Sequence, residues 1–141
     1  MKTNIYKFRT LVYYLSVVCF LVSSSYLSAQ DSTITQDKST QEKMTPVDAL
    51  QMMKDGNIRF MNDNMIQRKL TKQVLATSKG QYPYAVVLSC IDSRVAPEIT
   101  FDQGIGDIFD ARIAGNFVND DILGSMEFAC KVTGAKLILV M

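Results

Sequence analysis

The sequence predicts an α/β domain with a central parallel sheet and flanking helices. Three short apolar runs, at 85–89, 108–113 and 137–141, have the length of strands, and the first and third are continuous rather than alternating. Continuous apolar runs suit strands that are buried on both faces of a parallel sheet. A helical pattern separates the second run from the third, which predicts a βαβ unit with a right-handed crossover between parallel strands.

Length and composition allow one such domain. The chain has 141 residues, of which 48% are apolar and 21% are charged, as in an ordinary globular protein. A second domain is not expected at this length. The net charge of +1 gives no electrostatic reason to expect binding to nucleic acid.

The segment 1–29 has the pattern of a secretory signal peptide. Three basic residues among the first nine precede an apolar run at 11–22 that only Ser16 interrupts, and small and polar residues follow. A cut after Ala29 is expected, which would also remove Cys19. The apolar run is shorter than the ~20 residues that span a bilayer, so no stable membrane span is expected after cleavage. The mature protein is expected to be exported, to the periplasm or outside the cell.

Residues 30–44 are expected to be a polar tether that precedes the folded domain at 45–141. The segment carries almost no large apolar side chains, so it cannot bury enough surface to offset the loss of chain entropy.

Two helices are expected before the first strand. Thr45 can cap the first helix with its hydroxyl, and Pro46 suits the first helical position. The second helix is expected over 70–79 and ends at Gly80. The apolar side chains expected to face the core are Val47, Leu50, Met53 and Phe60 in the first helix, and Val74 and Leu75 in the second.

A third helix is expected between the second and third strands. Asn119 or Asp120 can cap it, and its core face carries Ile122, Met126 and Ala129. In open α/β sheets the ligand site lies beyond the carboxyl ends of the strands. Cys90 and Met141, which follow the first and end the third apolar run, are therefore expected at the same edge.

The candidate site is the sequence Cys-Ile-Asp-Ser-Arg directly after the first strand. It presents a thiol from Cys90, a carboxylate from Asp92 and a guanidinium from Arg94. The planar guanidinium suits a bidentate contact that orients Asp92 and keeps it ionised. An isolated cysteine is most often a buried thiol. Three polar groups at a strand end are costly to bury without a role, so a functional site is favoured.

This pattern resembles the first half of the zinc site of the β-class carbonic anhydrases. Residues 49–60 are similar to the amino-terminal helix of that family, and 106–116 resemble its second strand and the turn after it. The resemblance runs from about residue 45 to Met141. The family takes its other two zinc ligands from a His-x-x-Cys segment that would begin beyond Met141. The sequence is therefore expected to be truncated at its carboxyl end and to hold half of the site.

The resemblance implies a zinc enzyme that hydrates carbon dioxide reversibly to bicarbonate and a proton. Cys90 would be a zinc ligand, and Asp92 would either bind the metal or orient the nucleophile, depending on whether Arg94 holds it. Gln103 would contact bicarbonate. The family forms dimers or larger assemblies in which the amino-terminal helices embrace the partner, so the segment 45–80 implies a homo-oligomer.

Several alternatives stay open at this point. A truncated product or pseudoenzyme would keep the scaffold without holding zinc tightly through Cys90 and Asp92 alone. Hydrolysis of a related substrate such as carbon disulfide would use the same fold.

Cys130 is expected in the core, although a disulfide to Cys90 is possible in an oxidising compartment if no metal occupies Cys90. The third strand is expected to leave an apolar face without a covering helix, which would lower stability or solubility.

Overall fold

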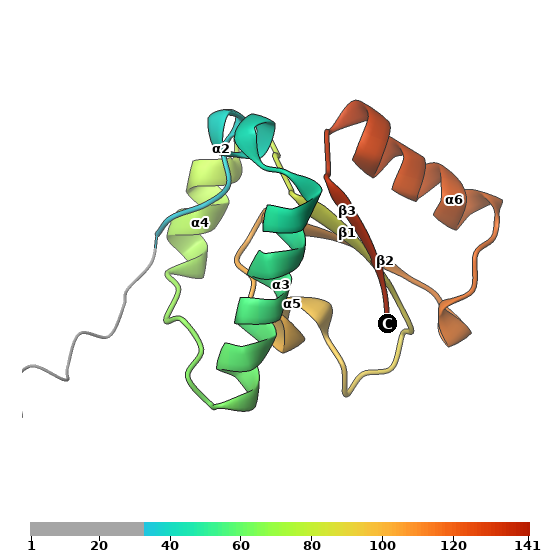
Figure 1. The fold of residues 1–141 in the computed structure, drawn as a ribbon, viewed down its shortest axis with the longest axis horizontal. Helices are drawn as coiled ribbons and strands as arrows, with labels where there is room; N and C mark the ends of the chain where they lie inside the picture. The colour runs from blue at the N-terminus through green and yellow to red at the C-terminus, as the bar shows by residue number, and fades with distance from the viewer. Residues whose placement is uncertain (1–32) are drawn as a thin grey trace, which may run out of the picture. The chain divides into compact units, whose positions relative to one another are not determined.

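The computed structural model describes residues 33–141, and these contain a parallel sheet of three strands in the order β2-β1-β3 (Figure 1). The central strand β1 (Ala85–Ser89) pairs with β2 (Ile108–Arg112) on one side and β3 (Leu137–Val140) on the other. The three predicted strands and their parallel arrangement are confirmed. Every residue of β1 is buried, as its continuous apolar pattern predicts.

The signal peptide expected at 1–29 lies outside the described residues. Among the helices of residues 33–141, none combines the length and the apolar content of a membrane-spanning segment.

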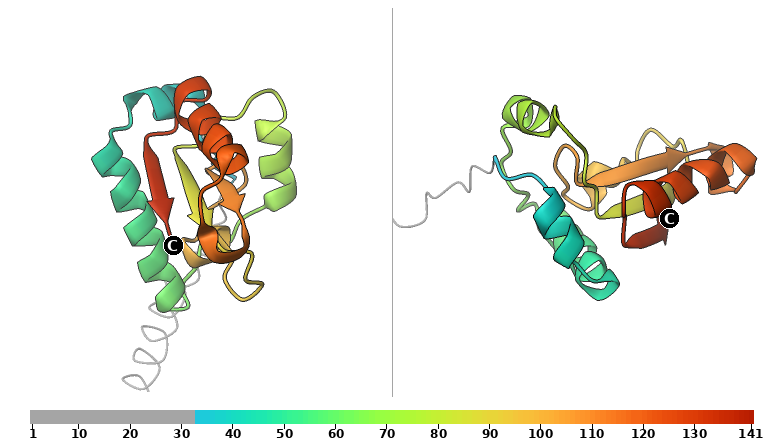
Figure 2. Two further views of the ribbon diagram at one scale, coloured as in Figure 1. Left: turned by 90° about the vertical axis from the view of Figure 1, so that its right-hand side faces the viewer. Right: turned by 90° about the horizontal axis from the view of Figure 1, so that it is seen from above.

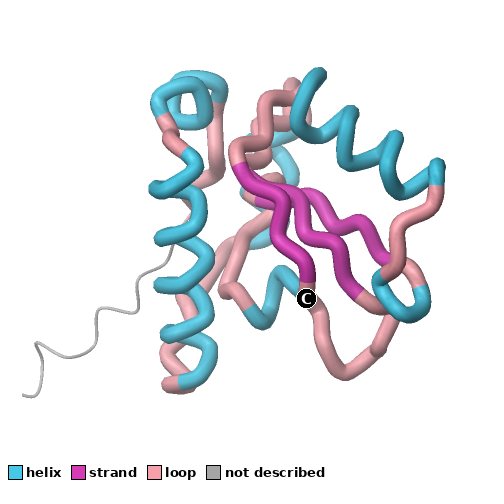
Figure 3. The backbone as a smooth tube through the Cα atoms, turned by 45° about the vertical axis from the view of Figure 1, so that its right-hand side comes forward, coloured by secondary structure: helices cyan, strands magenta, loops and turns pink. Residues whose placement is uncertain are grey.

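Two helices cover opposite faces of the sheet (Figure 3). On one face, α6 (Asp120–Glu127) continues into the π-helical turn η3 (Phe128–Val132). This face forms a core of Val86, Leu88, Ala111, Met126, Ala129 and Ala135. On the other face, α3 (Pro46–Met61) forms a core of Ala49, Met53, Tyr84, Ala85 and Val87. Successive side chains of β1 point to opposite faces, so one strand supplies both cores.

The helix starts agree with the predicted capping residues. Thr45 is the N-cap of α3, and it forms a capping box with Asp48, with Pro46 in the first turn. Asn119, one of the two predicted candidates, caps α6 by accepting a hydrogen bond of 2.9 Å from the backbone of Ile122.

The predicted inward faces of the first two helices are partly wrong. Val47 on α3 is 75% exposed, and Leu75 on α4 (Leu70–Thr77) is 73% exposed. Leu50, Phe60 and Val74 are also exposed. The buried residue of α4 is Gln73, whose amide donates to the carbonyl of Ile34 and accepts from the backbone of Ile105. The reason is that α4 meets loops, whose unpaired backbone groups require polar partners. Figure 2 shows α4 on the β2 side of the sheet and α3 along β3.

The expected polar tether is also partly wrong, because residues 38–43 form a helix, α2 (Lys38–Lys43). Its one buried residue is Gln41, which donates to the carbonyls of Pro83 at 2.7 Å and Thr133 at 2.9 Å. The segment joins the domain through hydrogen bonds to otherwise unpaired carbonyls rather than by burying apolar surface. Amino-acid composition does not reveal attachment of this kind.

An ion cluster that the sequence did not predict links the segments around α5 (Pro97–Thr100). The carboxylate of Asp102 is completely buried and accepts hydrogen bonds from Arg59 at 2.5 Å and from Arg68. Arg59 lies in the last turn of α3, and Arg68 lies before α4. One buried carboxylate therefore ties three separate segments together.

The uncovered apolar face expected on the third strand is confirmed. Leu137 and Leu139 pack against the α3 core, whereas Ile138 and Val140 are 49% and 61% exposed. Ile138 and Val140 pair with Val86 and Leu88 of β1, which lie in the core under α6. The exposed pair therefore lies on the same face of the sheet as α6.

Candidate metal centre

The carboxyl ends of the three strands meet at one edge, where Cys90 follows β1. Met141 follows β3, and its backbone donates to the carbonyl of Leu88 at 3.0 Å. Asn116, in the turn η2 (Ala114–Asn116) after β2, donates from its amide to the carbonyl of Met141 at 3.0 Å. The prediction that Cys90 and Met141 lie at the same edge is therefore confirmed.

The thiol of Cys90 is partly exposed, and the turn after β2 contacts it. The backbone N–H of Gly115 donates to Sγ of Cys90 at 3.3 Å. Gly115 has φ of +77°, a left-handed conformation that glycine adopts without steric cost. The hydrogen bond from Gly115, followed by those from the backbone of Asp92, lowers the pKa of the Cys90 thiol below its ordinary value. The thiolate, the form that binds metals, is therefore easier to form here than at an ordinary cysteine.

Asp92 and Arg94 form the predicted bidentate pair. Nε of Arg94 lies 3.0 Å from Oδ1 of Asp92, and Nη2 lies 2.7 Å from Oδ2. These hydrogen bonds, with one from the backbone N–H of Arg94, hold the pKa of the Asp92 carboxyl below its usual range. The arginine engages both carboxylate oxygens, so the structure shows the state in which Arg94 holds Asp92.

Arg112 also contacts the site, and the sequence did not single it out. From the end of β2, its guanidinium donates to the carbonyls of Cys90 at 3.0 Å, Asp92 at 2.8 Å and Val95 at 3.1 Å. The sequence feature that could have indicated Arg112 is its position at the carboxyl end of the second predicted strand, the same end of the sheet as Cys90. The carbonyls that it reaches depend on the path of the loop, which no sequence pattern specifies.

Gln103 lies elsewhere in the described domain. Its carboxamide is buried, donates to the carbonyl of Phe101 and accepts a hydrogen bond of 2.7 Å from the hydroxyl of Tyr84. Tyr84 precedes the amino end of β1, whereas Cys90 follows the carboxyl end. The expected contact of Gln103 with bicarbonate stays a prediction.

The donor set around Cys90 fits zinc in part. A thiolate and a carboxylate are both zinc ligands. The described residues hold no group of three or more histidine, cysteine or acidic side chains that could bind a metal ion. Cys130 packs against the α6 core, as predicted, and both it and Cys90 are free thiols.

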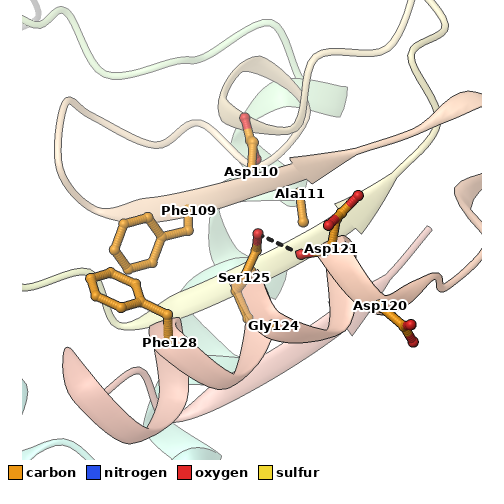
Figure 4. Close-up of a pocket in the computed structure, with 9 residues that line it drawn as sticks. Phe109, Asp110, Ala111, Asp120, Asp121, Gly124, Ser125 and Phe128 are labelled. Carbon is orange, nitrogen blue, oxygen red and sulfur yellow. Dashed lines mark hydrogen bonds between the residues drawn. The ribbon is translucent and has the colours of Figure 1, made fainter.

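A cavity of about 490 Å³ lies between β2 and α6 (Figure 4). Phe109 and Phe128 pack edge to face at one end of it, with their ring centroids 6.4 Å apart. The hydroxyl of Ser125 donates to the carbonyl of Asp121 within its own helix. Asp110 belongs to the same strand, but Figure 4 shows its carboxyl pointing away from α6. None of the residues that line the cavity belongs to the site at Cys90.

Asp110 forms a carboxyl pair with Glu98 of α5. Burial, then a hydrogen bond with Glu98 and its charge, raises the pKa of Asp110 to about 7, although Arg112 opposes the shift. Oδ1 of Asp110 is buried and has no hydrogen-bond partner among the described residues. The folded protein therefore holds a proton at Asp110 more tightly than the unfolded chain, where an aspartate has a pKa of about 3.9.

This shift predicts a loss of stability as the pH rises. The stabilisation from the protonated carboxyl is complete below a pH of about 4 and is lost as the pH rises through the folded pKa. The Asp110→Asn variant, which cannot ionise there, is expected to lack this decline. Urea unfolding between pH 4 and pH 8 measures it, with Asp120→Asn at an exposed position as the control. The same pH dependence in Asp110→Asn and the native protein would contradict the assignment.

Comparison with known proteins identifies the family. Residues 85–141 match the family model described as carbonic anhydrase. The chain is 43% identical over 97 residues to a carbonic anhydrase of Mycolicibacterium smegmatis, covering 68% of this chain and 47% of that protein. It is 42% identical over 97 residues to carbonic anhydrase 2 of Mycobacterium tuberculosis, with the same coverage. The chain thus spans about half the length of these curated relatives.

One further relative carries the class in its name, and one solved structure is similar in part. Beta carbonic anhydrase 1 of Caenorhabditis elegans is 37% identical over 65 residues, which cover 46% of this chain and 23% of that protein. The solved structure of the β-carbonic anhydrase CcaA is 28% identical, with a TM-score of 0.43 over 65% of this chain and 43% of that one. The family match and these sequence identities show that the chain belongs to the β-class carbonic anhydrase family.

Proposed function

We propose that the whole protein is a zinc enzyme that hydrates carbon dioxide reversibly to bicarbonate and a proton. The observation that carries the proposal is the partly exposed Cys90 thiol at the sheet edge, beside an Asp92 carboxylate that Arg94 holds with two hydrogen bonds. These residues lie within the segment that matches the carbonic anhydrase family.

Each residue of the site has a distinct task in this reaction. Cys90 would hold the metal through Sγ, and the N–H of Gly115 supports the thiolate that a zinc ligand requires. When bound, zinc supplies a Lewis acid that brings the pKa of water to about 7. Asp92 would accept a hydrogen bond from the attacking water and orient it, while Arg94 keeps the carboxylate ionised and in place.

Export and self-association belong to the same proposal. The basic and apolar pattern of residues 1–29 supports a secretory leader. The outer face of α3 exposes Val47, Leu50 and Ile58, and this apolar face supports packing against a second copy of the chain.

Three measurements test the proposal. Sequencing the gene past the codon for Met141 is expected to find an in-frame His-x-x-Cys segment. The purified full-length protein is then expected to contain zinc by elemental analysis and to hydrate carbon dioxide in stopped-flow measurements. A folded protein without zinc or hydration activity would overturn the proposal in favour of a pseudoenzyme.

Loss of the Asp92–Arg94 pair gives a sharper test of this mechanism. Arg94 is 85% exposed, so Arg94→Gln is expected to leave the melting temperature nearly unchanged. Without its partner, Asp92 is free to turn away from the water. We expect kcat/KM to fall about 10- to 100-fold, which corresponds to the free energy that hydrogen bonds to a charged group contribute. Lys131→Gln, which removes an exposed cation paired with Glu127, is the matched control. Equal kcat/KM in both variants would contradict the role of the pair.

A further inference from the structure

Arg112 stands out among the polar residues of the described domain because its guanidinium reaches three carbonyls of one loop. The loop is 90–95, within the connection 90–96 between β1 and α5, and it carries both Cys90 and Asp92. The guanidinium donates to three backbone carbonyls there, those of Cys90, Asp92 and Val95. A guanidinium that bonds carbonyls at the start, middle and end of a loop constrains its whole path.

The loop itself offers little else to hold it. Its internal hydrogen bonds all go to Asp92. The backbone of Val95 donates to the Asp92 carbonyl at 3.2 Å, and the backbone and guanidinium of Arg94 donate to the Asp92 carboxylate at 2.7 to 3.0 Å. Ile91, Ser93, Arg94 and Val95 are all exposed. These internal bonds are confined to 92–95 and do not tie the loop to the sheet. The contacts from Arg112, with the one from the N–H of Gly115 to Sγ of Cys90, provide that link.

The element that carries Arg112 is rigid by comparison. Arg112 pairs with Ser89 in the parallel ladder, and the next residue, Ile113, donates to the carbonyl of Ser89 at 3.1 Å. The arginine therefore transmits the position of the sheet to the loop. Its planar fork can donate in several fixed directions at once, which the single ammonium of a lysine cannot reproduce.

We propose that Arg112 is a positioning residue of the metal centre, which fixes the backbone of 90–95 and so sets where Sγ of Cys90 and the carboxylate of Asp92 lie. Arg94 orients the side chain of Asp92, and Arg112 holds the backbone from which that side chain extends. The proposal rests on the proposed function for the metal, but the restraint on the loop is a property of the chain itself.

Hydrogen exchange in the metal-free full-length protein tests the restraint directly. In Arg112→Ala, the amides of the peptide that covers 90–95 are expected to exchange about tenfold faster or more, because three charge-assisted hydrogen bonds are lost. Arg112→Lys is expected to restore the protection only in part. Phe109→Ala is the matched control, since it weakens the same strand on its α6 face without touching the loop. Unchanged exchange at 90–95 in Arg112→Ala would overturn the proposal.

Zinc affinity tests the consequence of this restraint for metal binding. It is measured by competition with a chromophoric chelator, at a temperature where all variants are folded. Arg112→Ala is expected to bind zinc about 10- to 100-fold more weakly, as when a ligand loses its supporting partner. Phe109→Ala is expected to lose stability but keep its affinity. Faster loop exchange in Arg112→Ala, with a native protein that holds no zinc, would confirm the restraint and refute the proposed function. Equal zinc affinity in Arg112→Ala and the native protein would refute the positioning role.

Discussion

Replacing Cys90 with serine is expected to remove zinc from the full-length protein and to abolish carbon dioxide hydration. The thiolate is the strongest metal donor of the described site, and a serine hydroxyl does not ionise at neutral pH. Loss of a residue that supports a metal ligand lowers metal affinity about 10- to 100-fold. Loss of the ligand itself is expected to lower zinc affinity by more than this. Chelator competition measures the affinity, and stopped-flow hydration measures the activity.

The second free cysteine of the described domain supplies the control for this variant. Cys130 belongs to η3 and packs against the α6 core, whereas Cys90 follows β1 at the sheet edge. Cys130→Ala is therefore expected to keep both zinc and activity, with a small loss of stability. If Cys90→Ser retained stoichiometric zinc, the metal would have to lie elsewhere and the proposed centre would be wrong.

Replacing Asp102 with asparagine is expected to lower the free energy of unfolding by about 3 to 5 kcal/mol, the usual effect of removing one partner of a buried ion pair. The carboxylate is fully buried, and the variant would leave Arg59 and Arg68 without their shared counter-charge. Urea unfolding of the full chain measures the difference.

The backbone of Asp102 determines the choice of substitution and control. Its φ is +47°, which asparagine tolerates nearly as well as aspartate, so the variant tests charge rather than strain. Asp63→Asn is the matched control, because Asp63 also has a positive φ of 51° but is exposed. A loss of less than about 1 kcal/mol in Asp102→Asn would show that the ion cluster contributes no more than an exposed pair.

The pH dependence of this effect has the opposite sign to that at Asp110. Burial disfavours ionisation of Asp102, but hydrogen bonds from Arg59 and Arg68 outweigh burial and hold its pKa below the ordinary value. Stability from Asp102 is therefore present above the unfolded pKa of about 3.9 and is lost as the pH falls through the folded pKa. The Asp102→Asn variant is expected to lack this acid-dependent part of the unfolding curve.

Short-range patterns in the sequence predicted the three strands, the helices α3, α4 and α6, and half of the candidate site. The apolar runs predicted the three strands, and Thr45 and Asn119 cap their helices as their residue types indicate. The bidentate pair of Asp92 and Arg94 was predictable because only two positions separate them, so the chain alone keeps them within reach. Each of these features depends on neighbours within a few residues.

Which face each peripheral helix buries was not predictable in the same way. On α4 the buried residue is Gln73 rather than Val74 or Leu75. On α2 the residue that joins the domain is Gln41, whose acceptors Pro83 and Thr133 are 42 and 92 positions away. Apolar periodicity indicates the core face where a helix packs on a sheet, but these helices meet loops that present unpaired carbonyls and amides.

The sequence by itself therefore determined the class of fold, the strands, the caps and the local chemistry of Cys90, Asp92 and Arg94. Only the tertiary structure decided which distant groups complete that chemistry. The N–H of Gly115 on the Cys90 thiol and the guanidinium of Arg112 on the loop carbonyls come from residues 25 and 17 to 22 positions away. Parallel pairing of β1 with β2 brings them there, and a hydrogen bond depends on positions within tenths of an ångström that residue types do not specify.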